Sequence, residues 1–244
     1  MNISEPDANH RILIIAEIGQ NHNGEMEIAR KLISAAKEEG ADIAKFQLYD
    51  VDAIFPPDFE WYKEAREAQL NKKQVAELAD YCGKAGIEFM ASAFDAERVG
   101  WGEEISMKRY KIASRSIYDK QLIDAVAKTG KDLIVSLGMY QESDFPSIDT
   151  GARVDFLYCV AKYPALPEDL NFLDVDFNRY AGFSDHTIGI DAALVAMARG
   201  ARIIEKHFTL DKGMHGPDHA GSMEPQELRQ IVESARKFEA ILYH

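Results

Sequence analysis

The sequence has little cysteine, no long apolar run and a shortage of basic residues. Its two cysteines, Cys82 and Cys159, are too few for a disulfide-stapled secreted fold and lack the paired spacing of a zinc site. It contains no run of about 18 apolar residues, and its polar start, MNISEPDANHR, has no signal-peptide pattern. These absences predict a reduced, cytoplasmic protein without membrane contact, in which both cysteines are small core residues.

The shortage of basic charge excludes another class of partner. Lys and Arg total 28 against 41 Asp and Glu, which gives a formal net charge of −13. A nucleic-acid-binding protein carries a basic surface, so no nucleic-acid partner is expected. An acidic protein can still bind an anionic small molecule where a few cations converge in one concave place. A phosphorylated or carboxylated substrate therefore stays compatible with this composition.

Short β-rich apolar runs alternate with amphipathic helical patterns along the whole chain. This alternation is typical of a parallel α/β protein. Strands are expected at Ile12–Ala16, Ile43–Leu48, Ile87–Ser92, Arg109–Ser114, Leu133–Leu137, Val154–Val160, Ala181–Ser184 and Arg202–Phe208. Helices are expected at Glu25–Glu39, Lys73–Ala85, Asp119–Lys128, Asp191–Arg199 and Pro225–Leu242, and only the piece after the sixth strand is short of helical pattern.

Eight parallel strands in a chain of 244 residues predict a closed (β/α)₈ TIM barrel, with an open doubly wound sheet as the alternative. With 46% hydrophobic residues and no Pro/Gly-rich linker, residues 1–244 are expected to form a single domain. Residues 52–72 are the one long irregular insert. We interpret this insert as a loop over a site or as an oligomer contact.

Polar residues collect at the carboxyl ends of the expected strands, where active sites of barrels lie. Alternate side chains point inward, so Ile203, Glu205 and His207 share the inner face of the last strand. Lys206 then faces the helical layer, where a salt bridge is expected. The same parity places further polar groups at the barrel mouth: Glu17, Lys45, Gln47, Lys111, Ser114, Ser136, Ser184 and His186.

Packing alone does not explain this set. A single buried lysine or histidine is more often a hydrogen-bonded structural residue than a functional one. Here at least five strand ends coincide, and each buried charge costs several kcal/mol unless it meets a partner or a ligand. Lys45 and Lys111, with the serine hydroxyls, suit a small ligand that carries phosphate and carboxylate groups.

Two pairs of histidines have spacings that suggest a metal. His186 and His207, expected on neighbouring strands, could hold a divalent ion completed by water or substrate oxygens, or could simply hydrogen-bond to each other. His215 and His219 in HGPDHAGS are separated by Gly and Pro, which exclude a regular helical pair. We interpret that segment as a substrate-contacting loop in which Asp218 accepts a sugar hydroxyl, with an ordinary solvated loop as the alternative.

Taken together, the motifs resemble the sialic acid (N-acetylneuraminate) synthase family, the phosphoenolpyruvate-dependent nonulosonate synthases. The resemblance runs in order from about residue 12 to residue 235, which makes it far more specific than any single motif. The segments that carry it are AEIGQNHNG (16–24), AKFQ (44–47), YKIAS (110–114), SLGM (136–139), YP (163–164), GFSDHTIG (182–189), IIEKHFTLD (203–211) and GPDH (216–219).

This resemblance implies a (β/α)₈ barrel that condenses phosphoenolpyruvate with the open-chain aldehyde of an N-acylated hexosamine, typically N-acetylmannosamine, and releases phosphate. It implies a divalent metal, Mn²⁺ or Mg²⁺, that polarises the aldehyde. Water would capture the charge that develops at C2 of phosphoenolpyruvate, and either Glu17 or Glu205 would handle protons.

The resemblance also assigns roles to individual residues. Catalytic roles fall on Glu17, Lys45, Lys111 and Glu205, and metal ligation falls on His186 and His207. Substrate contacts fall on Gln47, Ser92, Ser114, Ser136, Tyr163, Ser184 and Asp218. Among these, the lysines together with Ser114, Ser136 and Ser184 would form the phosphoenolpyruvate pocket, and Ser92 stands where threonine is frequent.

The sequence departs from the family pattern in three places, of which Ser116 removes a sugar contact and Ala161 removes one hydrogen-bond donor from the phosphoenolpyruvate pocket. The chain stops at His244, so the C-terminal antifreeze-like domain is expected to be absent, which leaves a homodimer or a separate lid subunit as the partner arrangements. Ser116 stands where an acidic sugar contact is common, and Ala161 stands where Asn or Ser is common. We therefore expect an active synthase with an altered acceptor. The alternatives are a noncatalytic phosphate- or sugar-binding barrel and a synthase of another 3-deoxy sugar acid.

Overall fold

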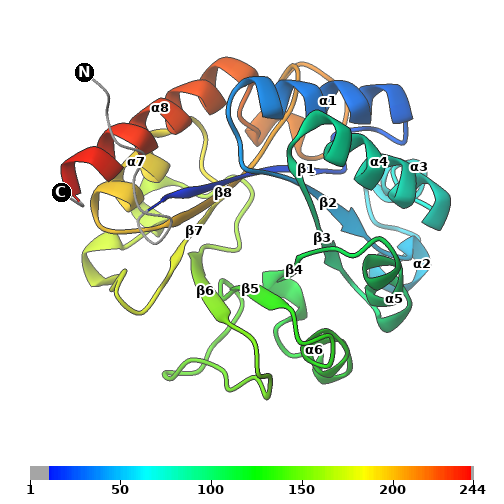
Figure 1. Cartoon of the computed structure of the whole chain (residues 1–244), viewed down its shortest axis with the longest axis horizontal. Helices are drawn as coiled ribbons and strands as arrows, with labels where there is room; N and C mark the ends of the chain where they lie inside the picture. Colours follow the sequence, from blue (N-terminus) through cyan, green and yellow to red (C-terminus); the bar gives the residue numbers. More distant parts are fainter. Residues whose placement is uncertain (1–10, 243–244) are drawn as a thin grey trace.

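The computed structural model describes residues 11–242, which form a closed barrel of eight parallel strands in the order β1 to β8 (Figure 1). This confirms the predicted TIM barrel and excludes the open sheet. The strands are β1 (Leu13–Gly19), β2 (Ile43–Leu48), β3 (Glu88–Ala93), β4 (Arg109–Ile112), β5 (Asp132–Ser136), β6 (Val154–Cys159), β7 (Gly182–Asp185) and β8 (Ile203–His207).

Helices form the outer layer of the barrel. They are α1 (Met26–Glu38), α2 (Val51–Ile54), α3 (Tyr62–Glu67), α4 (Lys72–Ala85), α5 (Ala96–Glu104), α6 (Lys120–Ala127), α7 (Asp191–Ala198) and α8 (Pro225–Leu242). The side chains of Asn71, Asp95 and Asp119 cap the amino ends of α4, α5 and α6. None of the helices in residues 11–242 is long and apolar enough to cross a membrane.

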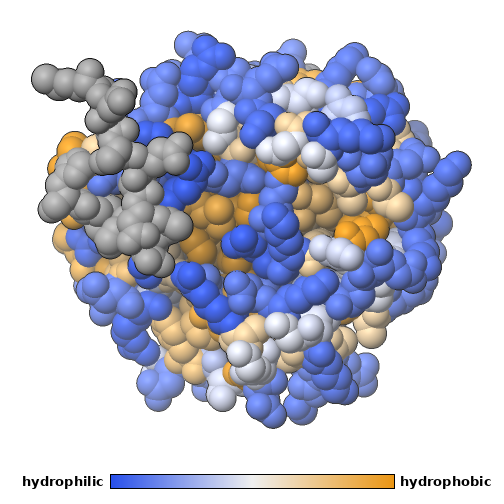
Figure 2. Space-filling view, in the orientation of Figure 1, coloured by the Kyte–Doolittle hydropathy of each residue, from blue (hydrophilic) through white to orange (hydrophobic). Residues whose placement is uncertain are grey.

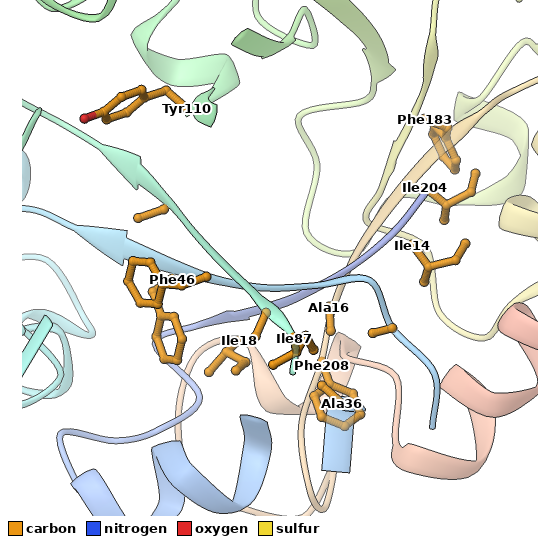
Figure 3. Packing of buried hydrophobic residues seen from close by; sticks show 14 of the residues in the cluster. Ile14, Ala16, Ile18, Ala36, Phe46, Ile87, Tyr110, Phe183, Ile204 and Phe208 are labelled. Atoms are coloured by element: carbon orange, nitrogen blue, oxygen red, sulfur yellow. The ribbon is translucent and has the colours of Figure 1, made fainter. Parts of the chain in front are cut away.

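Strand parity divides the apolar residues into two cores. A small inner core fills the barrel, and it consists of Ile15, Ile43, Met90, Ile134, Leu157 and Ile203. A larger outer core lies between the strands and the helices, where Ile14, Phe46, Ile204 and Phe208 pack (Figure 3). On the six strands that supply this inner core, the next inward residue lies closer to the carboxyl end of the barrel, which is where the polar residues appear.

The helical layer is incomplete beside β6. The segment between β6 and β7 contains no α-helix, as predicted. Residues 137–153 between β5 and β6 also contain none, which the sequence pattern did not indicate (Figure 1). Aromatic side chains cover this part of the barrel instead. The ring centroid of Phe145 lies 4.9 Å from that of Phe156 and 4.8 Å from that of Tyr180. The apolar outer face of β6 is therefore partly covered by loop side chains in place of a helix.

The prediction of an irregular insert at residues 52–72 is wrong, because this segment contains α3 and most of α2. Ala65 of this segment is buried in a satellite core together with Tyr49 and Val51, which directly precede the segment, and the one-dimensional pattern did not resolve this core. The phenol of Tyr49 donates to the carbonyl of Ala65 at 2.7 Å. Helix α5 was also missed, because it is short and carries two glycines.

Gly182 at the start of β7 allows β7 and β8 to pair closely. A methyl group at this position would lie 2.0 Å from the carbonyl oxygen of Ile203. We therefore expect Gly182→Ala to lower the free energy of unfolding by about 3 kcal/mol. Gly100→Ala in α5, where no neighbour lies within 4 Å, is the matched control and should raise it by about 0.5 kcal/mol. Urea denaturation measures both, and equal values for the two variants would contradict the close-approach argument.

Figure 2 shows one face of the molecule, on which apolar residues near the centre are surrounded by hydrophilic ones. The hydrophilic rim agrees with the charged composition of the chain.

Candidate active site

One pocket at the carboxyl ends of the strands gathers nearly all the predicted site residues. It is lined by Glu17, Lys45, Gln47, Ser92, Lys111, Ser114, Ser136, Tyr163, Ser184, His186, Glu205 and His207, together with Ala113, Cys159, Asp185 and Lys206. Asp218 is the one predicted residue that does not line this pocket. The pocket thus draws side chains from all eight strands and from the loops that follow them.

A buried cluster of two lysines and two carboxylates forms the floor of the pocket. Lys45 Nζ lies 2.8 Å from Glu17 Oε2 and 3.5 Å from Glu205 Oε2, and Lys111 Nζ lies 3.6 Å from Glu205 Oε1. All four residues are at least 94% buried. Two positive and two negative charges balance, which is how a barrel interior can hold four ionised groups.

The balance of burial and charge differs between the lysines. Burial opposes the charged form of Lys45, but Glu17 and Glu205 outweigh it and raise the pKa of that ammonium group. Burial dominates at Lys111 and lowers its pKa, although Glu205 pulls the other way. Burial also opposes the charge of Glu205, yet Lys111 and Lys45 prevail and lower the pKa of this carboxyl to about 2.

Hydroxyl and amide groups complete the floor. Lys111 Nζ donates to Ser136 Oγ at 2.6 Å, and Lys45 Nζ donates to Ser92 Oγ at 3.2 Å. Ser184 Oγ donates to Glu205 Oε1 and Gln47 Nε2 donates to Glu17 Oε1, each at 2.9 Å. Ser114 accepts the amide of Met139 at 2.6 Å, which fixes the loop after β5. The polar groups are therefore preorganised before any ligand binds.

His186 and His207 lie side by side above this floor, with ring centroids 6.1 Å apart. His186 Nδ1 donates to the carbonyl of Val160 at 2.8 Å, so Nε2 carries the free lone pair. Burial, assisted by the neighbouring His207, lowers the pKa of His186 to about 3. His207 Nδ1 is buried without a hydrogen-bond partner, and Tyr163 packs on His186 with ring centroids 4.1 Å apart.

The donor set suits a metal held by two protein ligands. A neutral imidazole oriented through its second nitrogen is a typical metal ligand, and His207 offers a buried nitrogen that no protein group satisfies. Among residues 11–242, no group of three His, Cys, Asp or Glu side chains is placed to hold a metal ion. Any further ligands would therefore have to be water or substrate oxygens.

Two features of the pocket wall were only partly anticipated. Cys159, which we expected to be a simple core residue, lines the pocket with Sγ 3.8 Å from His186 Nδ1. Burial raises the pKa of this thiol to about 12, so it stays protonated. Parity could have found it, because Leu157 on the same strand faces the inner core.

Behind the histidines, Lys206 donates to Asp185 Oδ2 at 3.0 Å in a completely buried ion pair. The predicted salt bridge of Lys206 is thereby confirmed. Because Lys206 and Asp185 directly precede His207 and His186, this pair links the ends of β7 and β8.

The low pKa of Lys111 has a consequence for pH dependence. Deprotonation removes the charge that an anionic ligand needs, so ligand affinity should fall as pH rises through a pKa below the ordinary lysine value of about 10.4. In the same window the unfolded chain binds more protons than the folded one, so the contribution of Lys111 makes stability rise with pH. Anion affinity and denaturant midpoints measured against pH test these opposite trends, and parallel trends would contradict them.

The pattern of the NeuB family matches residues 32–244. The N,N'-diacetyllegionaminic acid synthase of Legionella pneumophila is 34% identical over 94% of this chain and 72% of its own length. The human N-acetylneuraminate-9-phosphate synthase is 33% identical over 96% of this chain and 72% of its own length. The crystal structure of N-acetylneuraminic acid synthetase from Leptospira borgpetersenii has a TM-score of 0.90 at 32% identity and covers 100% of this chain and 89% of that one. The family pattern and the similarity to these three relatives show that the chain belongs to the NeuB family.

Proposed function

We propose that the protein condenses phosphoenolpyruvate with the open-chain aldehyde of an N-acylated amino sugar, giving a nonulosonic acid and phosphate. The observation that carries this proposal is the buried cluster of two lysines and two carboxylates directly beneath His186 and His207. An anion site and two ligand-competent imidazoles share one pocket, as a reaction between an anionic donor and a polarised aldehyde requires. The family relationship supports the same reaction.

Phosphoenolpyruvate would bind over the lysines. Lys45 and Lys111 supply charged donors, and Ser114, Ser136 and Ser184 supply hydroxyls from the ends of β4, β5 and β7. Because Glu17 and Glu205 neutralise the lysines in the free protein, the carboxylates must lose part of this pairing when the ligand arrives. Before the ligand binds, the pairing with the carboxylates stabilises the two lysine charges, which would otherwise be too costly to bury.

His186 and His207 would hold a divalent cation, Mn²⁺ or Mg²⁺, which supplies Lewis-acid polarisation of the sugar aldehyde when bound. The residues around it perform the other tasks. Tyr163, packed on His186, covers one side of the aldehyde site. Asp218, whose Oδ2 lies 3.8 Å from His207 Nδ1, is placed to accept a hydrogen bond from a sugar hydroxyl beside it.

The two carboxylates differ in their suitability for proton transfer. Glu205 lies between two lysines, accepts from Ser184 and has a pKa of about 2, so it stays ionised and orients its neighbours. Glu17 pairs with a single lysine and lies opposite His207 in the β1–β8 register. We therefore assign to Glu17 the role of positioning the water that attacks C2 and taking its proton.

The acceptor side differs from the common family pattern. Ser116, which stands where an acidic residue is common, is buried in the 3₁₀ turn Ser114–Ser116 and does not line the pocket. Ala161, where the family pattern has a donor of the phosphoenolpyruvate pocket, is exposed and has no side-chain hydrogen-bonding group. An acceptor other than N-acetylmannosamine, such as another N-acylated amino sugar, fits this difference.

The test measures phosphate release from phosphoenolpyruvate with Mn²⁺ and a panel of acceptors, with and without a chelator. The panel contains N-acetylmannosamine, its 6-phosphate, other N-acylated hexosamines and phosphorylated aldoses. Metal-dependent release with an amino sugar supports the proposal. Release with phosphorylated aldoses alone would favour a synthase of another 3-deoxy sugar acid, and no release with any acceptor would favour a noncatalytic binding barrel.

A further inference from the structure

The loop that carries Asp218 connects β8 to α8 and is tied to the loop between β1 and α1. Asp218 is part-buried, and its carboxylate reaches His207 Nδ1 only at 3.8 Å, so no hydrogen bond between these two side chains fixes it. A loop of this length samples many conformations unless other contacts restrict it. The contacts that do so come from the residue after Asp218, which is His219.

His219 is fully buried, and both of its ring nitrogens have partners. Nδ1 lies 2.7 Å from Thr209 Oγ1 at the start of the loop, and Nε2 lies 3.1 Å from Asn23 Oδ1 in the β1–α1 loop. The amide nitrogen of Asn23 donates to the carbonyl of His215 at 3.0 Å, which assigns Oδ1 as the acceptor facing His219. His219 Nε2 therefore carries a proton and donates it to Asn23.

A second tie acts on the backbone of Asp218 itself. Ser222 Oγ donates to the carbonyl of Asp218 at 2.7 Å, and Asn21 Nδ2 donates to Ser222 Oγ at 2.9 Å. The chain passes over His219 at Gly216, whose φ of 149° favours glycine and where a methyl group would lie 2.8 Å from His219 Cδ2. Asp218 is thus restrained through its own carbonyl and through the next side chain.

The other histidine of this loop provides a contrast. His215 has a side chain that is 75% exposed, and its Nε2 lies 3.0 Å from Glu64 Oε1 on α3. The spacing of His215 and His219 resembles that of metal ligands, yet the structure separates them into an exposed ion pair and a buried structural contact. The side chain of His219 links the start of the Asp218 loop, at Thr209, to the β1–α1 loop, at Asn23.

We infer that His219 is a positioning residue that, through Asn23 and Thr209, holds Asp218 beside His207 for the acceptor sugar. This inference rests on the proposed function, because it assigns the acceptor contact to Asp218. His219 lies outside the pocket and touches neither substrate in this arrangement, so it acts through Asp218 alone. Its loss should change how the acceptor binds and leave the phosphoenolpyruvate site over the lysines on the pocket floor untouched.

The first experiment is a double-mutant cycle with His219→Ala, Asp218→Asn and the double variant, with His215→Ala as the matched control. We expect His219→Ala to raise the KM for the acceptor about tenfold and to leave the KM for phosphoenolpyruvate within about twofold. Because His219 acts through Asp218, the double variant should resemble Asp218→Asn alone. His219→Gln, which can still donate to Asn23, should recover part of the loss, and His215→Ala should have no effect.

The inference would be overturned if the increases in acceptor KM from the two single changes multiplied in the double variant. It would also be overturned if His219→Ala raised the KM values for the acceptor and for phosphoenolpyruvate equally. Amide hydrogen exchange of residues 211–223 provides a readout that needs no turnover and covers a variant too unstable for kinetics. Faster exchange in this segment for His219→Gln or His219→Ala, but not for His215→Ala, supports the positioning role of His219. Unchanged exchange in the His219 variants refutes it. If the unmodified protein shows no turnover, the proposed function fails and the exchange experiment alone decides the positioning role.

Discussion

Replacing Lys111 with methionine is expected to weaken phosphoenolpyruvate binding by about a hundredfold, which corresponds to roughly 3 kcal/mol. Lys111 Nζ is buried, donates to Ser136 Oγ and lies 3.6 Å from Glu205. Methionine has a similar length but no charge, so the change removes a charge-assisted donor from a desolvated site. It also leaves Glu205 with Lys45 as its only cationic partner, so the floor of the pocket becomes more negative toward an anionic ligand.

The fold should tolerate this change, because burial already disfavours the charged form of Lys111. Equilibrium binding of phosphoenolpyruvate, followed by calorimetry, measures the effect without requiring an acceptor. Lys108→Met is the matched control, since Lys108 is exposed just before the opposite end of β4 and carries the same charge. Unchanged affinity in Lys111→Met, or equal loss in both variants, would place the phosphoenolpyruvate site elsewhere.

Replacing His207 with alanine is expected to abolish tight Mn²⁺ binding and to lower metal-dependent turnover about a thousandfold, or roughly 4 kcal/mol of transition-state stabilisation. The ring of His207 is 87% buried, yet its Nδ1 makes no hydrogen bond in the free protein. A buried polar atom without a partner carries a cost that a ligand can remove. Loss of the ring therefore removes a ligand nitrogen and should leave the structural hydrogen bonds of residues 11–242 intact.

Mn²⁺ binding by electron paramagnetic resonance and turnover with and without a chelator measure the two effects separately. His215→Gln serves as the control, because it removes an exposed imidazole whose side chain pairs with Glu64. If His207→Ala binds Mn²⁺ and turns over as the unmodified protein does, the ligand assignment is wrong. If it binds Mn²⁺ normally but loses turnover, His207 acts on the substrate directly.

Strand parity predicted which side chains lie together at the barrel mouth, because it depends only on local geometry. Once Ile15, Ile43 and Ile203 fill the barrel, Glu17, Lys45 and Glu205 must follow at its mouth, whatever the loops do. The same reasoning placed Lys206 on the outer face. Cys159 obeys the rule as well, and only its small size and apolar character kept it from being counted among the pocket residues.

Parity could not predict the contacts made between loops. The link from His219 to Asn23 joins residues 196 positions apart, and neither lies in a regular strand or helix with a repeating pattern. The helices within 52–72 were hidden for a different reason, because their few apolar residues form a small core beside the main one. The missing helix after β5 is explained by tertiary packing, since the rings of Phe145 and Tyr180 are far apart in sequence and close in space.

This aromatic cover gives the ring of strands an uneven mechanical character. Beside α1, α4 and α8, the barrel is enclosed by continuous hydrogen-bonded backbone, whereas beside β6 it is enclosed by individual rings on loops. Contacts between side chains on loops lack the repeating backbone hydrogen bonds that hold a helix together. We therefore expect local opening to start in the sector around β6, while the lysine–carboxylate floor on β1, β2, β4 and β8 keeps its geometry. Cys159 and His186 lie at the border between these two sectors.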